Sequence, residues 1–176
     1  MKRFILVAII LSTAVALAGA SASKAESLTD AQIESIKANC FTVRNTLNQL
    51  HTSDAILRVN IGQRYESMST KLMGRFNRRV SANGLQNTSL LQATNDYVSS
   101  LNDFRSLYRA YEEHLATATR IDCNSKPSEF YEAIISAQEK RKEVHGAVIK
   151  LDGGLKGYLD VVNRFEIDFK AVGGAL

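Results

Sequence analysis

The chain has 176 residues, of which 45% are hydrophobic and 23% charged, which is the composition of one globular domain. It has a single proline, and only three glycines fall between residues 20 and 145; this excludes an all-β fold, whose turns need both residue types. The formal net charge of +4 falls to +2 without the basic leader described next, and so small a charge gives no general argument for nucleic-acid binding.

The first 25 residues have the layout of a secretory signal peptide. Lys2 and Arg3 form a positive start, residues 4–18 form an apolar run without a charge, and small residues follow. This layout predicts export with cleavage after Ala20 or Ala22. The alternative is a retained membrane anchor, but the apolar run is shorter than the roughly 20 residues that span a bilayer. We expect residues 23–176 to form a single helical-bundle domain in the cell envelope or outside the cell.

The first predicted helix spans residues 29–82. Thr29 and Gln32 form a capping-box pattern at its start, and Asn83-Gly84 is a typical stop. Apolar residues recur in steps of three and four, as in a coiled-coil seam, and then drift in steps of four, which indicates a local stutter. The expected seam is Ile33, Ile36, Cys40, Val43, Leu47, Leu50, Leu57, Ile61, Tyr65, Met68, Leu72, Phe76 and Val80.

Two more helices are predicted over residues 88–122 and 128–170. The seam of the second helix is expected at Leu91, Thr94, Val98, Leu101, Phe104, Tyr108, Tyr111, Leu115 and Ala118. The third follows Pro127, which is common near helix starts. Its seam is expected at Phe130, Ile134, Ala137, Arg141, Val144, Val148, Leu151, Leu155, Tyr158, Val162, Phe165 and Phe169. This register continues through Gly153, Gly154 and Gly157, so we expect one helix, weakened or kinked by its glycines.

Short connections make consecutive helices antiparallel. The expected fold is therefore all-α, an elongated, coiled-coil-like antiparallel three-helix bundle. If the chain turns back near residue 83, the third helix runs parallel to the first with an offset of about 85 residues. Residues 29–42 then extend beyond most of the bundle, and they either fray, pack on the loop around Pro127 or meet a partner chain.

Two cysteines in an exported chain predict one disulfide. The antiparallel register places Cys40 opposite residue 127, four residues from Cys123, so a bond between them would close the base of the first hairpin. The alternative is a pair of free thiols in the core, which an oxidising compartment disfavours.

Two charged residues interrupt different seams at the same height. Asp54 occupies a core position of the first helix, and Arg141 occupies one of the third. The offset of about 85 residues places Arg141 beside residue 56 of the first helix, two residues from Asp54. We expect a core ion pair between them, with Tyr111 able to add a hydrogen bond. The alternative is that each charged side chain reaches water separately.

We find no pattern of catalytic, cofactor-binding or metal-binding residues. The sequence contains no G-x-S-x-G, phosphate-binding loop, dinucleotide fingerprint, HExxH or CxxC. His51 and His114 fall at nearly one level, but histidines that flank a bundle core are more often solvated or hydrogen-bonded than metal-bound. We therefore expect no enzyme, no cofactor and no metal.

A basic stretch lies between residues 58 and 80, where six cationic side chains are opposed by Glu66 alone. Most of the cations recur at helical spacing, which predicts one shared face. The candidate contacts to an anionic polymer or lipid surface are Arg64, Lys71, Arg75, Arg78 and Arg79. Extracellular nucleic acid would bind through the same charges without sequence specificity. The alternative is a solvated face that Asp96 and Asp103 partly neutralise.

Several segments resemble small exported helical proteins without assigned function from candidate-phylum bacteria similar to Patescibacteria or Saccharibacteria. The segments are Asn39-Cys40, Asp54-Ala55-Ile56-Leu57-Arg58-Val59-Asn60, Leu72-Met73, Phe76-Asn77 with Arg79, and Ile121-Asp122-Cys123 with Pro127 and Phe130-Tyr131. The similarity spans most of residues 39–145 and departs in the glycine-rich segment 153–157. It implies an exported, disulfide-bonded helical protein and transfers no activity.

The function expected from these features is a non-enzymatic binding or spacer module of the cell envelope or the secreted fraction. The alternative is an envelope chaperone that holds unfolded chains, which would need an exposed apolar groove. An enzyme is the third alternative, without a recognisable set of nucleophile, base and oxyanion donors.

Overall fold

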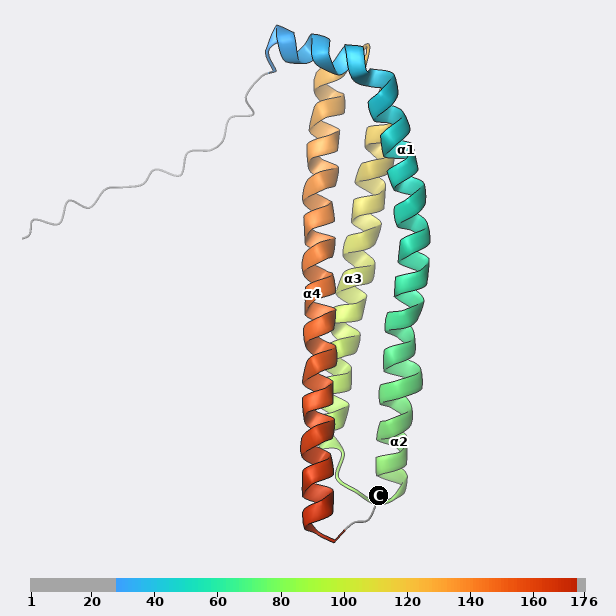
Figure 1. Cartoon of the computed structure of the whole chain (residues 1–176), viewed down its shortest axis with the longest axis vertical. Helices are drawn as coiled ribbons and strands as arrows, with labels where there is room; N and C mark the ends of the chain where they lie inside the picture. The colour runs from blue at the N-terminus through green and yellow to red at the C-terminus, as the bar shows by residue number, and fades with distance from the viewer. Residues whose placement is uncertain (1–27, 174–176) are drawn as a thin grey trace, which may run out of the picture.

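The computed structural model describes residues 28–173, so the predicted signal peptide lies outside the described residues. The chain forms α1 (Asp30–Ser67), the π-helical turn η1 (Met68–Met73), α2 (Gly74–Ala82), α3 (Thr88–Arg120) and α4 (Pro127–Ala171). These elements confirm an all-α bundle, with no strand among the described residues (Figure 1). We call α1, η1 and α2 together the first rod, because they follow one another without a break.

The ends of the helices follow the signals in the sequence. The capping box at the start of α1 is formed, with the Gln32 backbone N–H donating to the Thr29 hydroxyl and the Thr29 N–H donating to the Gln32 side chain. The first rod ends at Ala82, and Gly84 two residues later has a φ of 67°, in the left-handed region that favours glycine. Pro127 is the first residue of α4, where its missing N–H costs no helical hydrogen bond.

The three long segments alternate in direction, and their packing is uneven. The α3 and α4 helices lie side by side along the bundle and make the most extensive contacts, whereas α1 packs less extensively against either of them (Figure 1). Helix α4 is continuous through Gly153, Gly154 and Gly157, so it is one helix, as expected. A Cβ at Gly154 would lie 3.4 Å from the ring of Tyr97, which shows that α4 packs directly on α3 at this glycine.

The first turns of α1 lie across the end of the bundle rather than projecting beyond it (Figure 1). Ile36 and Cys40 pack with Ile121, Cys123 and Phe130 in a small cluster separate from the main core. Of the three alternatives for residues 29–42, packing on the loop around Pro127 is therefore the one that is observed. We call residues 30–47 the cap, because buried Cys40 and several partly buried apolar side chains of this segment cover this end.

The seam of the first rod changes phase at η1. Leu72, an expected seam residue, is 50% exposed, whereas its neighbour Met73 is fully buried and Asn77 is 3% exposed. A π-helical turn contains one residue more than an α-helical turn, so it moves the following residues to a different face. The register thus changes locally where the sequence predicts a stutter, but Ser69, Met73 and Asn77 are buried there instead of Leu72 and Phe76, and only Val80 is buried as expected.

The seam of α3 also differs from expectation at its start. Leu90 and Tyr97 are buried, whereas Leu91 is 45% exposed and Val98 only half-buried. From Leu101 onwards the expected and observed positions agree. The observed seam keeps the alternating steps of four and three, through Leu90, Thr94, Tyr97 and Leu101. This register places the large side chain of Tyr97 in the core.

No helix among residues 28–173 is both long enough and apolar enough to cross a lipid bilayer.

Candidate functional site

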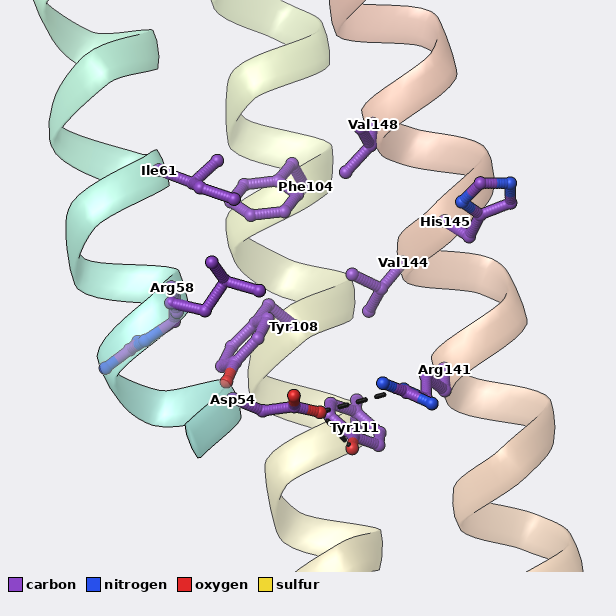
Figure 2. A pocket seen from close by; sticks show the side chains of 11 residues that line it. Asp54, Arg58, Ile61, Phe104, Tyr108, Tyr111, Arg141, Val144, His145 and Val148 are labelled. Carbon is purple, nitrogen blue, oxygen red and sulfur yellow. Dashed lines mark hydrogen bonds and ion pairs between the residues drawn. The ribbon is translucent and has the colours of Figure 1, made fainter. Parts of the chain in front are cut away.

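Two surface features stand out on this bundle, and the first is a cleft between α1 and α4. We call it the α1–α4 cleft; it has a volume of about 230 Å³ and a floor formed by α3 (Figure 2). The lining residues are Asp54, Leu57, Arg58, Ile61, Phe104, Tyr108, Tyr111, Arg141, Val144, His145 and Val148.

The cleft exists because α1 packs loosely against α4 at this level. Leu57, an expected core residue, reaches into the gap but remains 54% exposed. Val144 and Val148 face it from α4, and the ring of Phe104 lies between the two helices on the floor (Figure 2). Apolar surface therefore dominates the lining, and the polar groups are divided between one end of the cleft and its edges (Figure 2).

The polar end is closed by the predicted interaction between Asp54 and Arg141. The Tyr111 hydroxyl donates a hydrogen bond of 2.7 Å to Oδ2 of Asp54, and Nε of Arg141 lies 3.6 Å from the same oxygen. Figure 2 shows these contacts joining all three helices across the cleft. The pairing and the added hydrogen bond both agree with the register derived from the sequence.

The prediction was wrong about the burial of this pair. The Arg141 side chain is 57% exposed, while that of Asp54 is 15% exposed. Arg141 lies at the edge of the bundle because its long side chain can lean from a seam position to water. The contact is therefore a half-exposed ion pair anchored on a buried tyrosine, and its Coulomb energy is reduced by solvent.

Arg58 and Glu112 form a second charged pair beside the cleft. Nη1 of Arg58 lies 3.8 Å from Oε2 of Glu112, and the Arg58 guanidinium carbon stands 5.1 Å from the centre of the Tyr108 ring. This is the distance of a cation–π contact. Nε of Arg58 and the Tyr108 hydroxyl are buried, and neither has a hydrogen-bond partner among the described residues.

Burial controls the protonation of the two tyrosines on the floor. Desolvation, followed by the nearby carboxylates of Glu112 and Asp54, raises the pKa of Tyr108 to about 12. Burial and the hydrogen bond to Asp54 raise the pKa of Tyr111. Both hydroxyls therefore keep their protons to well above neutral pH; that of Tyr111 donates to Asp54, whereas that of Tyr108 has no acceptor among the described residues.

The second feature is the basic stripe, which we define as Arg64, Lys71, Arg75, Arg78 and Arg79. All five side chains are exposed, and none has a carboxylate within 4.0 Å among residues 28–173. A shallow depression at the α2 end of the first rod is lined by three of these cations, Arg75, Arg78 and Arg79.

The acidic neighbours form no ion pair with this stripe within the described chain. Glu66, the one acid in the basic stretch, pairs with Arg105 of α3, and Asp96 accepts a hydrogen bond from Gln92. Asp103 forms no ion pair with a described residue. Arg58 is the only cation of the basic stretch that has a carboxylate partner within the described chain.

The disulfide prediction is confirmed: Cys40 and Cys123 are bonded, with their Cα atoms 5.6 Å apart. Asp122 lies beside them, but the bonded sulfurs are not thiolate ligands for a metal. The His114 ring lies 2.8 Å from the Ser136 hydroxyl, as expected for a hydrogen-bonded histidine that flanks the core.

Sequence reasoning missed Tyr108, Arg58 and Glu112 as a group. Tyr108 was assigned only to the seam, and Arg58 only to the basic stretch. A signal was present, because the register that pairs Asp54 with Tyr111 also places Arg58 one turn along α1, next to Tyr108 on α3. Nothing in the spacing indicated that α1 and α4 would leave a gap there.

Comparison of the chain with protein-family models, curated proteins and solved structures finds no match. The resemblance to small exported helical proteins therefore stays a prediction.

Proposed function

We propose that this chain is an exported, non-enzymatic binding module that docks on an anionic surface of the cell envelope through its basic stripe. The observation that carries the proposal is a group of five exposed cations, close together in the sequence, without carboxylate partners among the described residues. Cations on protein surfaces commonly find acidic neighbours, and a group that lacks them attracts external anions.

The position of the stripe supports this proposal. It runs along the lower half of the first rod to α2, at the end of the bundle opposite the Cys40–Cys123 bond (Figure 1). Side chains at one end of an elongated bundle can meet a flat or polymeric surface without interference from the rest of the molecule. The common chemistry of the proposed ligand is a dense array of phosphate groups, carried by lipid head groups or by a polymer.

The test measures binding of the oxidised chain lacking residues 1–22 to vesicles containing phosphatidylglycerol and to soluble polyphosphate. We expect binding at low salt that weakens steeply toward physiological salt, and none to phosphatidylcholine vesicles. Binding to only one of the two anions identifies whether lipid or polymer carries the phosphate. Binding to neither contradicts the proposal.

A charge-reversed variant, Arg75→Glu with Arg78→Glu, tests whether the stripe itself makes the contact. Each cation near an anionic surface contributes about 1 kcal/mol, so we expect binding to weaken about thirtyfold or more. Arg109→Glu with Lys142→Glu is the matched control, because it changes the net charge equally on exposed positions of α3 and α4. Equal weakening by both variants would show that only net charge matters.

A further inference from the structure

We propose that the basic stripe recognises a phosphate monoester, and that Arg75, Arg78 and Arg79 of α2 bind its terminal oxygens. We call these three residues the arginine cluster. Near neutral pH a phosphate monoester carries a charge of about −1.5 to −2 and has three terminal oxygens that accept hydrogen bonds. A phosphodiester has two such oxygens and a single negative charge. The inference rests on the proposed function, because it names the ligand group for part of the same stripe.

The three arginines share one face of α2. Arg78 and Arg79 lie three and four residues after Arg75, which is the spacing at which helical side chains are neighbours. All three line the shallow depression at the α2 end of the first rod, together with Ala82. This depression has a volume of about 440 Å³, so a phosphate head group can enter it without moving a helix. Three guanidinium groups are therefore within reach of one phosphate.

The Arg78 side chain extends back along α2. Its Nη1 lies 3.8 Å from the position that a Cβ at Gly74 would take. The guanidinium group therefore lies about one turn before the Cα of Arg78, close to the level of Arg75. This places its donors away from the carbonyl groups at the C-terminal end of α2, whose partial negative charge would oppose an anion.

The arginine cluster has no acidic partner within the described chain. None of its side chains has a carboxylate within 4.0 Å, and no acid stands three or four residues from any of them. Most ion pairs among residues 28–173 join residues at that spacing, so the local partner found elsewhere is missing here. Like charges three or four residues apart repel each other. An anion with more than one negative charge relieves this repulsion better than a monoanion does.

The choice of arginine points to the geometry of the ligand as well as to its charge. The local ion pairs of the described chain all use lysine: Lys37, Lys126, Lys140 and Lys170. The arginines in ion pairs instead reach carboxylates on other helices: Arg58, Arg105 and Arg141. A guanidinium group presents parallel N–H donors that bind two phosphate oxygens at once, whereas an ammonium group acts as a point charge. Three arginines without a carboxylate partner in the described chain therefore match a group with several terminal oxygens.

The experiment compares two lipid surfaces of equal charge. The oxidised chain lacking residues 1–22 is bound to phosphatidylcholine vesicles that contain either phosphatidic acid, a monoester, or phosphatidylglycerol, a diester. The two compositions are adjusted to the same zeta potential, so the general attraction of cations to the surface is equal. We expect the affinity for the phosphatidic acid vesicles to be at least about fivefold higher, because the third terminal oxygen adds charge-assisted hydrogen bonds.

A charge-conserving variant tests the arginine cluster itself. The variant replaces all three members: Arg75→Lys, Arg78→Lys and Arg79→Lys. Because it keeps the charge and removes the paired donors, we expect the ratio of the two affinities to fall to about one. The matched control replaces three exposed arginines that lie outside the stripe and form no ion pair with a described residue: Arg109→Lys, Arg120→Lys and Arg164→Lys. The control should keep the full preference, and circular dichroism checks that both variants are folded.

A second measurement on the unmodified sequence separates the two sources of a monoester. The side-chain Nε–H signals of the arginine cluster are followed by NMR during titration with glycerol 3-phosphate, a soluble monoester, and with dimethyl phosphate, a diester. We expect larger shifts with the monoester. Saturation by glycerol 3-phosphate would show that the phosphate group suffices, as on a soluble molecule or a polymer end. A response to phosphatidic acid vesicles alone would assign the group to a lipid.

Three results would overturn the inference. Equal affinity for the two kinds of vesicle contradicts the preference for a monoester but leaves docking on an anionic surface intact. A preference that persists in the lysine variant, or that is lost equally in the control, contradicts the assignment to the arginine cluster. If the lysine variant does not fold, equal NMR shifts with glycerol 3-phosphate and dimethyl phosphate decide against the cluster. Absence of binding to both kinds of vesicle contradicts the proposed function itself.

Discussion

At the scale of single residues, three tyrosines connect the loosely packed first rod to the α3–α4 pair. The Tyr111 hydroxyl donates to Asp54, Tyr97 donates to the Tyr65 carbonyl at 3.1 Å, and Tyr158 donates to Oδ1 of Asn77 at 2.8 Å. Each hydrogen bond joins a buried ring on one side to a polar group on the other. Because a register shift would leave buried hydroxyls without partners, these contacts favour one alignment of the helices.

The stability contributed by Asp54 should come mainly from Tyr111 and only slightly from Arg141. Asp54→Ala leaves the buried Tyr111 hydroxyl without its acceptor, so we expect a loss of about 1–3 kcal/mol of unfolding free energy. Arg141→Ala should cost less than about 1 kcal/mol, because that side chain is 57% exposed. Chemical denaturation of both variants measures the difference.

The control for this prediction is the double variant Asp54→Ala with Tyr111→Phe, which removes both partners of the hydrogen bond. It should be no less stable than Asp54→Ala alone, since no hydroxyl is left unpaired. A loss in Arg141→Ala as large as in Asp54→Ala would instead show that the ion pair dominates.

At the scale of elements, η1 aligns two parts of the first rod that the sequence pattern alone leaves out of phase. Residues of α1 up to Tyr65 pack toward α3, and a continuous α-helix would then bury Leu72 instead of Met73. The extra residue in η1 corrects the phase, so that Met73 and Asn77 face the core. Asn77 can then donate to Thr94 at 2.8 Å and accept from Tyr158.

Deleting one exposed residue from η1 should convert it to an α-helical turn without changing which sides of α1 and α2 face the core. We expect the variant lacking Thr70 to fold, with thermal stability close to that of the full chain. Circular dichroism during heating measures this, and loss of cooperative unfolding would contradict it.

Deletion of Asn60 is the matched control, because it removes an exposed residue from the regular part of α1. It rotates one part of α1 by about 100° relative to the other and exposes buried side chains. We expect it to cost more than about 3 kcal/mol. Equal stability of the two deletion variants would show that η1 has no role in phase.

The helices and their neighbours could be predicted from the sequence, but the local phase and the cleft could not. Caps and periodicity gave the boundaries, and the offset of about 85 residues agrees with the contact between Tyr158 and the Met73 carbonyl, which are 85 residues apart. Leu90 and Leu91 are adjacent, so both fit a helical period, and only packing around Tyr97 selects Leu90. The cleft depends on side-chain volumes from three helices, which spacing does not encode.

At the scale of the whole molecule, the chain consists of a main core along the bundle and a smaller cluster under the cap. Cys40, Cys123 and Phe130 are the buried residues of that cluster, and the hairpin of α1 and α3 is closed there by the disulfide. Within the cap itself, Cys40 is the only buried residue. The cap is therefore held in place mainly by the disulfide, whereas the main core is held together by side-chain packing.

Removing the disulfide should destabilise the whole chain and release the cap first. Cys40 and Cys123 are 83 residues apart, and constraining so long a loop stabilises the folded state by about 4 kcal/mol in the chain-entropy model. In Cys40→Ala with Cys123→Ala we expect the thermal midpoint to fall by about 8–16 °C. Limited proteolysis should cut within residues 30–47 before it cuts α3 or α4, because those two helices keep their mutual packing. The wild-type chain treated with a reductant is the control and should behave like the variant. An unchanged midpoint, or first cleavage in α3 or α4, would show that the cap is held by packing alone.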